Sequence, residues 1–139
     1  MKISPYLVFN GNCAEAVLFY EKAFNVKAEV MYYKDAPLDK GYEFTADNPN
    51  FVMHAQFALD SEVIMLCDTP PEEPANVGGN FAIMAEFNTI TAATAIFSAL
   101  KEGGEISMEL QETFWSKCFG SLTDKFGINW HISVGCPTE

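Results

Sequence analysis

The stretch SPYLVFNGNCAEAVLFYEKAF, residues 4–24, decides the fold because it joins a strand to a helix through the short turn NGN. The strand is predicted over residues 3–9, where Pro5 favours an edge position or a late start. The helix that follows has Asn12 as its predicted N-cap, and Glu15 is placed to reach back to that cap. Its apolar face is formed by residues that recur at helical spacing: Cys13, Ala16, Val17, Tyr20 and Phe24.

Outward from this stretch, the first half of the chain continues as strands and ends in a linker. Residues 34–50 are polar and carry Pro and Gly, which predicts a long loop. Asp60 and Ser61 predict a tight hairpin between two apolar runs. The segment TPPEEPANVGG, residues 69–79, is rich in Pro and Gly without periodicity, which is typical of a linker. The strands expected in this half are residues 28–33, 51–59 and 62–68.

After the linker, the same order of elements is predicted again. A strand over residues 80–87 precedes a helix from about residue 91 to 101, which Gly103 and Gly104 end. The strands expected after this helix are residues 105–110, 113–123 and 128–134. At an offset of 78 positions, the first parts of the two halves share four identities: Phe9 with Phe87, Asn10 with Asn88, Ala14 with Ala92, and Phe19 with Phe97.

We therefore predict an α+β fold of two βαβββ modules, as an internal duplication would produce. The first module covers residues 1–68, the linker 69–79 and the second module 80–139, all within a single domain over 1–139. Each module is expected to be a curled four-stranded sheet with one helix on its outside. Two such sheets side by side would form a curled mixed sheet around a cleft.

The composition indicates a folded, acidic protein and excludes several classes of function. The net charge is −11 and the isoelectric point is near 4.4, whereas nucleic-acid binding needs clustered Lys and Arg. No apolar run approaches the ~20 residues that cross a bilayer, and no signal peptide is recognised. A cytoplasmic location is expected, with no membrane partner. The cysteines form no CxxC pair and are expected to be reduced: Cys13, Cys67, Cys118 and Cys136.

This layout and several motifs resemble the vicinal oxygen chelate superfamily of glyoxalase I, extradiol dioxygenases, fosfomycin-resistance enzymes and bleomycin-binding proteins. Within it the chain looks most like the PhnB-like group. The motifs that carry the resemblance are residues 4–24, LCD at 66–68, QETFW at 111–115 and FG-x-LTDKFGINW at 119–130. The resemblance implies a homodimer of paired βαβββ modules. It also implies a divalent metal in the cleft, bound by the first and last strand of each module.

The metal-ligand positions that the resemblance implies carry unsuitable side chains in this sequence. They fall at Ser4 or Tyr6, at Met65, at about Phe81 and at His131. Only His131 is a competent ligand, whereas a catalytic zinc site uses three protein ligands. We therefore predict no cofactor. A divalent metal anchored on His131 is the less favoured alternative.

Two histidines are the chemically distinctive candidates. His54 shares one face of its predicted strand with Gln56, because side chains alternate along a strand. It is interpreted either as a general base in the cleft or as a half-buried histidine bonded to a neighbour. The resemblance places His131 in the cleft, and the adjacent Trp130 is expected to be core on one side and close to the cleft on the other. Asp124 to Gly127 predicts a tight turn.

Further candidates lie in the signature segment of the group. Glu112 and Trp115 either contact a ligand or, in the case of the aromatic ring, fill the core or a dimer interface. Taken together, the candidate ligand-binding residues are Tyr6, His54, Met65, Phe81, Glu112, Trp115, Trp130 and His131.

The sequence favours a homodimeric small-molecule-binding protein without the usual metal site, and it does not identify the ligand. An enzyme of lyase, transferase or dioxygenase type is the alternative, acting on a small metabolite or antibiotic in the same cleft. A scaffold that only dimerises is the third interpretation.

Overall fold

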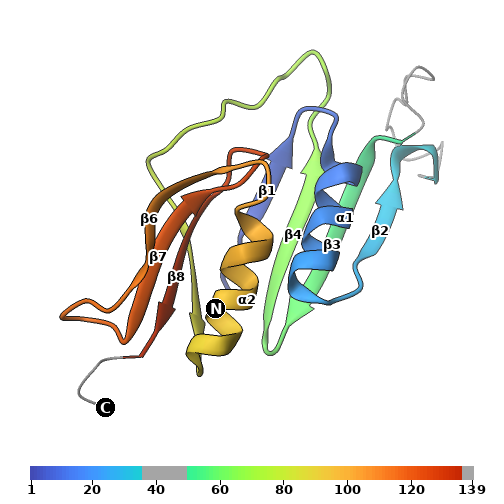
Figure 1. Cartoon of the computed structure of the whole chain (residues 1–139). Coiled ribbons are helices and arrows are strands. Elements are labelled where there is room, and N and C mark those ends of the chain that lie inside the picture. Colours follow the sequence, from blue (N-terminus) through green and yellow to red (C-terminus); the bar gives the residue numbers. More distant parts are fainter. Residues whose placement is uncertain (36–49, 136–139) are drawn as a thin grey trace. The chain divides into compact units, whose positions relative to one another are not determined.

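The computed structural model describes residues 1–35 and 50–135. Most of the predicted loop at 34–50 lies outside the described residues, as does Cys136. The chain divides into two compact units, Met1–Asn76 and Val77–Glu139, and the division falls within the predicted linker. Each unit combines one helix with one four-stranded sheet, so the predicted α+β fold of two βαβββ modules is confirmed (Figure 1).

The first unit contains α1 (Cys13–Phe24) and a sheet in the order β1-β4-β3-β2. Its strands are β1 (Tyr6–Phe9), β2 (Glu29–Tyr32), β3 (Val52–Leu59) and β4 (Glu62–Asp68), and a short 3-10 helix follows β2 at Tyr33–Asp35. β1 pairs with β4 in parallel, and the other pairs are antiparallel. β1 lies at the sheet edge and starts only after Pro5, as the sequence indicates. Asp60, at φ 55°, forms the predicted tight turn between β3 and β4.

The core of the first unit lies between α1 and one face of this sheet. The helix buries Cys13, Ala16, Val17 and Tyr20, which confirms most of the predicted apolar face. Tyr20 packs against Phe57 of β3, with the ring centroids 6.3 Å apart. Burial of each large apolar side chain contributes roughly 1.5–3 kcal/mol, and this core holds the sheet against its helix.

The cap of α1 differs from the prediction. The Asn12 side chain makes no cap hydrogen bond. Instead, the buried Asp68 carboxylate accepts from the N–H groups of Gly11 at 2.8 Å, Cys13 at 3.0 Å and Val52 at 2.9 Å. A carboxylate also suits the positive end of the helix dipole. Asn12 occupies the N-cap position as predicted, but the side-chain acceptor comes from the end of β4, far away in sequence.

The first part of the linker belongs to the first unit. The side chain of Asn10 donates to the carbonyl oxygen of Ala75 at 3.1 Å and accepts from the N–H of Ala75 at 2.8 Å. These two hydrogen bonds pin the linker beside the end of β1. Asn10 is one of the identities shared by the two halves, and its role here is structural.

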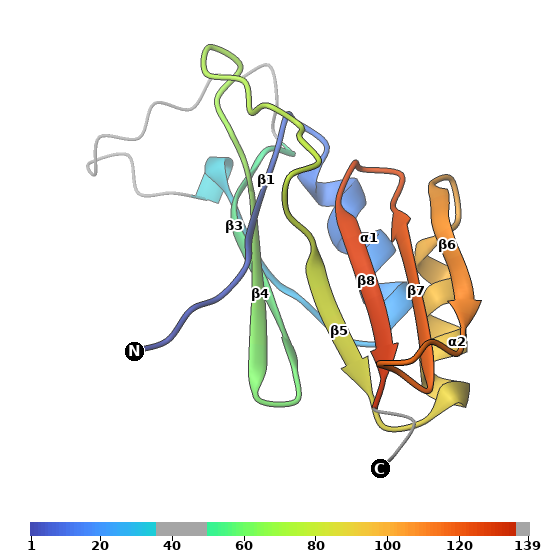
Figure 2. The same cartoon turned by 90° about the vertical axis from the view of Figure 1, so that its left-hand side faces the viewer.

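The second unit repeats the order of the first (Figure 2). Its elements are β5 (Ile83–Phe87), α2 (Ile90–Leu100), β6 (Glu105–Gln111), β7 (Cys118–Thr123) and β8 (Asn129–Val134), with the strands in the order β5-β8-β7-β6. β5 pairs with β8 in parallel, as β1 does with β4. The helix begins at the cap Thr89, whose hydroxyl accepts from the N–H of Ala92 at 3.1 Å. Neither α1 nor α2 is long and apolar enough to cross a membrane, and the described residues contain no other candidate.

Two segments near the C-terminus show how local hydrogen bonds set the strand boundaries. β7 begins at Cys118 rather than Thr113, because the buried Ser116 hydroxyl lies within 2.8 Å of the Cys118 carbonyl and 2.7 Å of the Val134 carbonyl. The predicted turn at Asp124–Gly127 is confirmed. One Asp124 carboxylate oxygen accepts from the N–H groups of Phe126 and Ile128, and Gly127 has φ 86°.

Each helix covers one face of its own sheet, and we call the opposite face the open face. On the first sheet, the open face carries the side chains that alternate with the buried ones: Tyr6, Val8, Met31, His54, Gln56, Met65 and Cys67. On the second sheet, the open face carries Met84, Glu86, Phe119, Ser121, His131 and Ser133. The sheet candidates Tyr6, His54, Met65 and His131 therefore lie on the faces away from the helices.

Candidate functional site

The strand register defines equivalent positions in the two units. Tyr6 pairs with Met65 across the parallel strands β1 and β4, and Met84 pairs with His131 across β5 and β8. The ligand position that the resemblance places at about Phe81 is therefore occupied by Met84. Phe81 lies just before β5. The shift arises because the second unit's first strand begins at Ile83 rather than at residue 80.

These positions do not fit a metal ion. In the first unit the register pairs a phenol with a thioether, and in the second unit it pairs a thioether with an imidazole. Hard divalent cations and zinc need carboxylate, imidazole or thiolate donors in a group of three or more. Within residues 1–35 and 50–135, no group of three His, Cys, Asp or Glu side chains is arranged to hold a metal.

On the open face of the first unit, three side chains form a hydrogen-bonded chain. The Tyr6 hydroxyl lies 2.8 Å from Nδ1 of His54, and Nε2 of His54 lies 3.0 Å from Oε1 of Gln56. Because Oε1 only accepts, a neutral imidazole donates its Nε2–H to Gln56 and accepts the Tyr6 proton at Nδ1. The Tyr6 and His54 rings also meet edge to face, with centroids 5.6 Å apart. Tyr6, His54 and Gln56 are thus a connected polar group.

The surroundings of Tyr6 favour its neutral form. Burial, followed by the nearby thiol of Cys67, raises the pKa of Tyr6 to about 12. Burial likewise raises the pKa of the Cys67 thiol, and the neighbouring Tyr6 hydroxyl opposes that rise. Met65 lies opposite Tyr6 on the neighbouring strand. At neutral pH, this face therefore presents an uncharged hydroxyl and an uncharged thiol beside a thioether.

The open face of the second unit contains a cavity of about 440 Å³. One wall is the segment Gly79–Ala82, and the floor comes from β6, β7 and β8. Asn129 holds that wall in place, since its side-chain amide donates to the carbonyl oxygens of Phe81 at 3.1 Å and Gly78 at 3.4 Å. Thr123 in turn donates to the Asn129 side-chain oxygen at 2.7 Å. The cavity is therefore shaped by specific hydrogen bonds and not by packing alone.

Several polar groups in this cavity are left without a partner. Ser107, Ser121 and His131 line it, and none of their side chains forms a hydrogen bond with any part of the chain that the structure describes. Hydroxyl and imidazole groups both donate and accept. The cavity therefore offers adaptable hydrogen bonding next to the apolar ring of Phe81, which is the usual make-up of a small-molecule site.

A chain of aromatic contacts leads from His131 to an exposed loop. The ring centroids of His131 and Phe119 are 5.6 Å apart, those of Phe119 and Trp115 are 5.5 Å apart, and those of Trp115 and Phe114 are 4.8 Å apart. Phe114 is 90% exposed and Trp115 is 46% exposed. Glu112 is exposed in the same loop. The signature segment is thus physically connected to the cavity residue His131.

Trp130 is placed differently from the other candidates. It is 1% exposed, and its indole N–H donates to the second carboxylate oxygen of Asp124 at 2.9 Å. Its neighbour His131 points to the opposite face of β8, because side chains alternate along a strand. The expected ligand contact of Trp130 is therefore replaced by a core role.

Sequence reasoning missed the serines and the amide of the cavity. Ser107, Ser121, Thr123 and Asn129 alternate with apolar residues in β6, β7 and β8, and that period was the available signal. The alternation does not indicate that the segment Gly79–Ala82 lies beside these strands. That segment turns a polar sheet surface into a cavity.

Comparisons with known proteins agree on the family. The sequence model of the Glyoxalase/Bleomycin resistance protein/Dioxygenase superfamily matches residues 2–132. Protein YjdN of Escherichia coli K12 is 32% identical over 143 residues, covering 96% of this chain and 95% of that protein. The solved structure of protein PA1353 from Pseudomonas aeruginosa has a TM-score of 0.86 at 34% identity, with 98% of each chain covered.

A further solved structure links the chain to the PhnB proteins. It is named as a putative 3-demethylubiquinone-9 3-methyltransferase, PhnB protein, from Bacillus cereus. The TM-score is 0.71 at 25% identity, with 97% of this chain and 100% of that one covered. The predicted resemblance to the PhnB-like group is confirmed.

Proposed function

The chain belongs to the glyoxalase/bleomycin resistance protein/dioxygenase superfamily, and on that premise we propose that it is a PhnB-like small-molecule-binding protein. The binding site is the cavity on the open face of the second unit. The observation that carries the proposal is that Ser107, Ser121 and His131 surround a space of about 440 Å³ and that their side chains form no hydrogen bond within residues 1–35 and 50–135. The usual metal site of the family plays no part in it.

The lining defines the class of ligand. A volume of this size lies within the roughly 300–1,000 Å³ of small-molecule sites. The hydroxyls of Ser107 and Ser121 and the His131 ring favour a compact molecule with several hydrogen-bonding oxygens or nitrogens. The Phe81 ring favours an apolar or aromatic flank on that molecule. Binding leaves these polar groups paired, which is worth about 0.5–1.5 kcal/mol for each neutral hydrogen bond.

The proposal also covers the oligomeric state, the location and the partners of the protein. Phe114 and Trp115 project from the loop before β7, and exposed aromatic pairs of this kind are enriched at protein interfaces. They support a homodimer. The acidic charge and the absence of CxxC pairs support a cytoplasmic protein that binds neither nucleic acid nor membrane.

Ligand-observed NMR with a library of small hydroxylated and heteroaromatic compounds tests the binding site. We expect hits whose signals recover in Ser121→Ala and His131→Ala proteins, because each variant removes a polar contact from the cavity. Ser98→Ala is the matched control, since Ser98 is an exposed serine of α2 in the same unit. Hits that persist unchanged in both cavity variants would refute this site.

The Tyr6–His54–Gln56 chain favours a second candidate function, an enzyme acting on a small metabolite or antibiotic. In it, His54 accepts a proton through the 2.8 Å contact with the Tyr6 hydroxyl, and Gln56 holds the ring orientation. The His54→Ala, His131→Ala double variant is expected to abolish turnover of any substrate found. An unchanged rate in that variant would eliminate this candidate.

The methyltransferase name of the Bacillus cereus protein is not carried over to this chain. Common methyltransferases hold their nucleoside cofactor on a glycine-rich loop in a doubly wound parallel sheet. Here, each four-stranded sheet has one parallel pair and two antiparallel pairs. The fold thus lacks the frame on which that cofactor is usually bound.

A further inference from the structure

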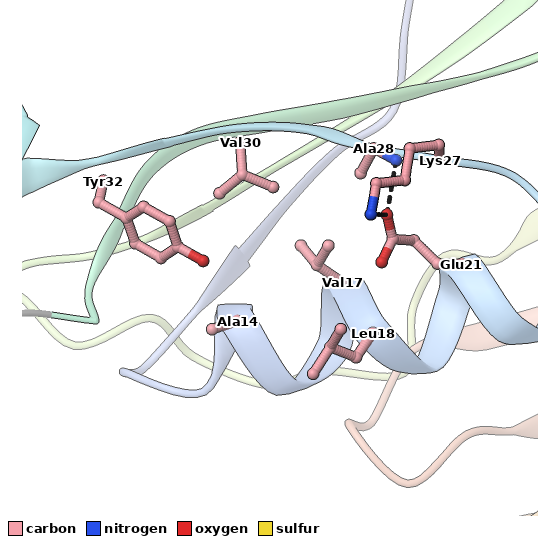
Figure 3. A pocket seen from close by; sticks show the side chains of 8 residues that line it. All are labelled: Ala14, Val17, Leu18, Glu21, Lys27, Ala28, Val30 and Tyr32. Carbon is pink, nitrogen blue, oxygen red and sulfur yellow. Dashed lines mark hydrogen bonds and ion pairs between the residues drawn. The ribbon is translucent and has the colours of Figure 1, made fainter.

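A second concave feature lies in the first unit, on the helix side of its sheet. It is a groove of about 330 Å³ between α1 and the edge strand β2 (Figure 3). Ala14, Val17 and Leu18 of α1 face Val30 of β2 across it. The groove is separate from the open face, so neither the candidate cavity nor the Tyr6–His54 chain contributes to it.

One end of the groove carries a carboxylate that is only partly satisfied. Oε2 of Glu21 accepts from the N–H of Ala28 at 2.7 Å. Nζ of Lys27 lies 4.0 Å away, at the outer limit of an ion pair, and the two side chains are 93% exposed for Lys27 and 15% exposed for Glu21. Oε1 of Glu21 has no partner in the part of the chain that the structure describes.

Because Lys27 is distant and exposed, the Glu21 carboxylate is favoured as a binding point for a cation that is not part of the chain. A largely buried carboxylate loses solvation, and a charge-assisted hydrogen bond restores it. An exposed, flexible lysine at the limiting distance contributes little, because water screens the pair. Oε1 is open to solvent, since no buried side-chain oxygen of the described residues lacks a partner, and a donor placed inside the groove would replace water there. The net charge of −11 also raises the concentration of cations near the surface.

The other end of the groove carries a phenol. The hydroxyl of Tyr32 points into the space between β2 and α1 (Figure 3). It makes no hydrogen bond with the described residues. The Lys34 amine lies 5.3 Å from the centroid of the Tyr32 ring. The groove therefore runs from a carboxylate through apolar walls to a free hydroxyl.

We propose that this groove binds a small organic ammonium ion with an apolar body. The ammonium group donates to Oε1 of Glu21, the body packs between Val17 and Val30, and a polar group at the far end meets the Tyr32 hydroxyl. The volume admits one small molecule and not a peptide helix or strand. Glu21 sets the charge preference, and the apolar walls exclude strongly hydrated inorganic cations.

Tyramine is a suitable probe, and tyrosol, with a hydroxyl in place of the amine, is its neutral counterpart. An NMR titration of the full chain at pH 7 and low salt is expected to show tyramine shifts in α1 and β2. Tyrosol is expected to bind at least about tenfold more weakly, since a charge-assisted hydrogen bond is worth roughly 1.5–3 kcal/mol. Equal binding of the two probes, or no tyramine binding, would overturn the proposal.

Substitutions locate the site. Glu21→Gln keeps an acceptor for the N–H of Ala28 and is expected to weaken tyramine binding about tenfold. Glu29→Gln removes the same charge from outside the groove and is expected to leave tyramine binding unchanged. Ala14→Phe fills the groove and is expected to abolish binding. His131→Ala is expected to have no effect, which separates this proposal from the proposed function. Equal effects of Glu21→Gln and Glu29→Gln would show only a general attraction of cations and overturn the site.

Discussion

The Tyr6 hydroxyl lies 2.8 Å from Nδ1 of His54 although β1 and β3 are not neighbours in the sheet. The contact passes over β4, which separates the two strands, on the open face of the first unit. It is the link that joins Tyr6, His54, Gln56 and the nearby Cys67 into one polar group. Its consequences for thiol chemistry and for titration are measurable without knowledge of the ligand.

The reactivity of Cys67 depends on Tyr6. The neighbouring Tyr6 hydroxyl opposes the burial that raises the pKa of the Cys67 thiol. Tyr6→Phe removes that hydroxyl, so less thiolate is present and alkylation of Cys67 by iodoacetamide at pH 8 slows several-fold. Peptide mapping by mass spectrometry measures the rate at this one cysteine. Tyr32→Phe serves as the control, and an equal slowing in both variants would contradict the assigned contact.

The titration of Tyr6 predicts a loss of stability at high pH. Its pKa is about 12 in the folded protein, above the ordinary value near 10. Between these values the folded protein binds more protons than the unfolded chain, so stability falls as pH rises. The contribution is complete below pH ~10 and lost as pH passes about 12. In urea unfolding at pH 9 to 12, Tyr6→Phe is expected to show a shallower decline than the parent protein, and parallel curves would argue against the shift.

Asp68 is predicted to be a structural residue with a large effect on stability. Its carboxylate accepts from the N–H groups of Gly11, Cys13 and Val52. In Asp68→Asn, an amide N–H₂ replaces one acceptor and faces a backbone donor, which is expected to cost about 2–4 kcal/mol. Asp60→Asn, in the exposed turn, is expected to stay within about 0.5 kcal/mol. Chemical denaturation measures both, and similar stabilities would rule out this role.

Gly104 is predicted to be intolerant of any side chain. A Cβ at this position would collide with the carbonyl oxygen of Thr123, which belongs to the backbone and cannot rotate away. Gly104→Ala is therefore expected to lower the free energy of unfolding by about 2–4 kcal/mol. A Cβ at Gly79 would meet no atom within 4 Å, so Gly79→Ala is the control. Equal thermal unfolding temperatures for the two variants would disprove the packing described here.

The fold was predictable because its signals are periodic and repeated. The offset of 78 that relates Phe9 to Phe87 also relates Tyr6 to Met84, and the register places both at the same point of a parallel pair. Alternation along the strand correctly placed His54 and Gln56 on one face. The boundaries of β7 were less predictable, because the buried Ser116 hydroxyl ends the loop through contacts with a distant strand.

The site was predictable only in part, because contacts between distant segments shape it. Tyr6 and His54 were both candidates, but for separate reasons. No local sequence pattern indicates that these two residues, which are 48 positions apart, form a hydrogen bond. His131 was found, whereas Ser107 and Ser121 were missed because serines on a strand normally face water. Trp130 was expected to be core on one side only, and the structure buries it throughout because the Asp124 carboxylate, held by the turn, accepts its indole N–H in the core.

The cavity of the second unit is tested most directly by an NMR titration of the full chain with the best library compound, read at residues on both sheets. Binding in the cavity of the second unit predicts shifts at Ser107, Ser121 and His131 that saturate with compound and vanish in His131→Ala. They should be unchanged by added chelator, because no metal takes part. Saturable shifts confined to other residues, or shifts that need a divalent metal, would rule out metal-free binding in this cavity.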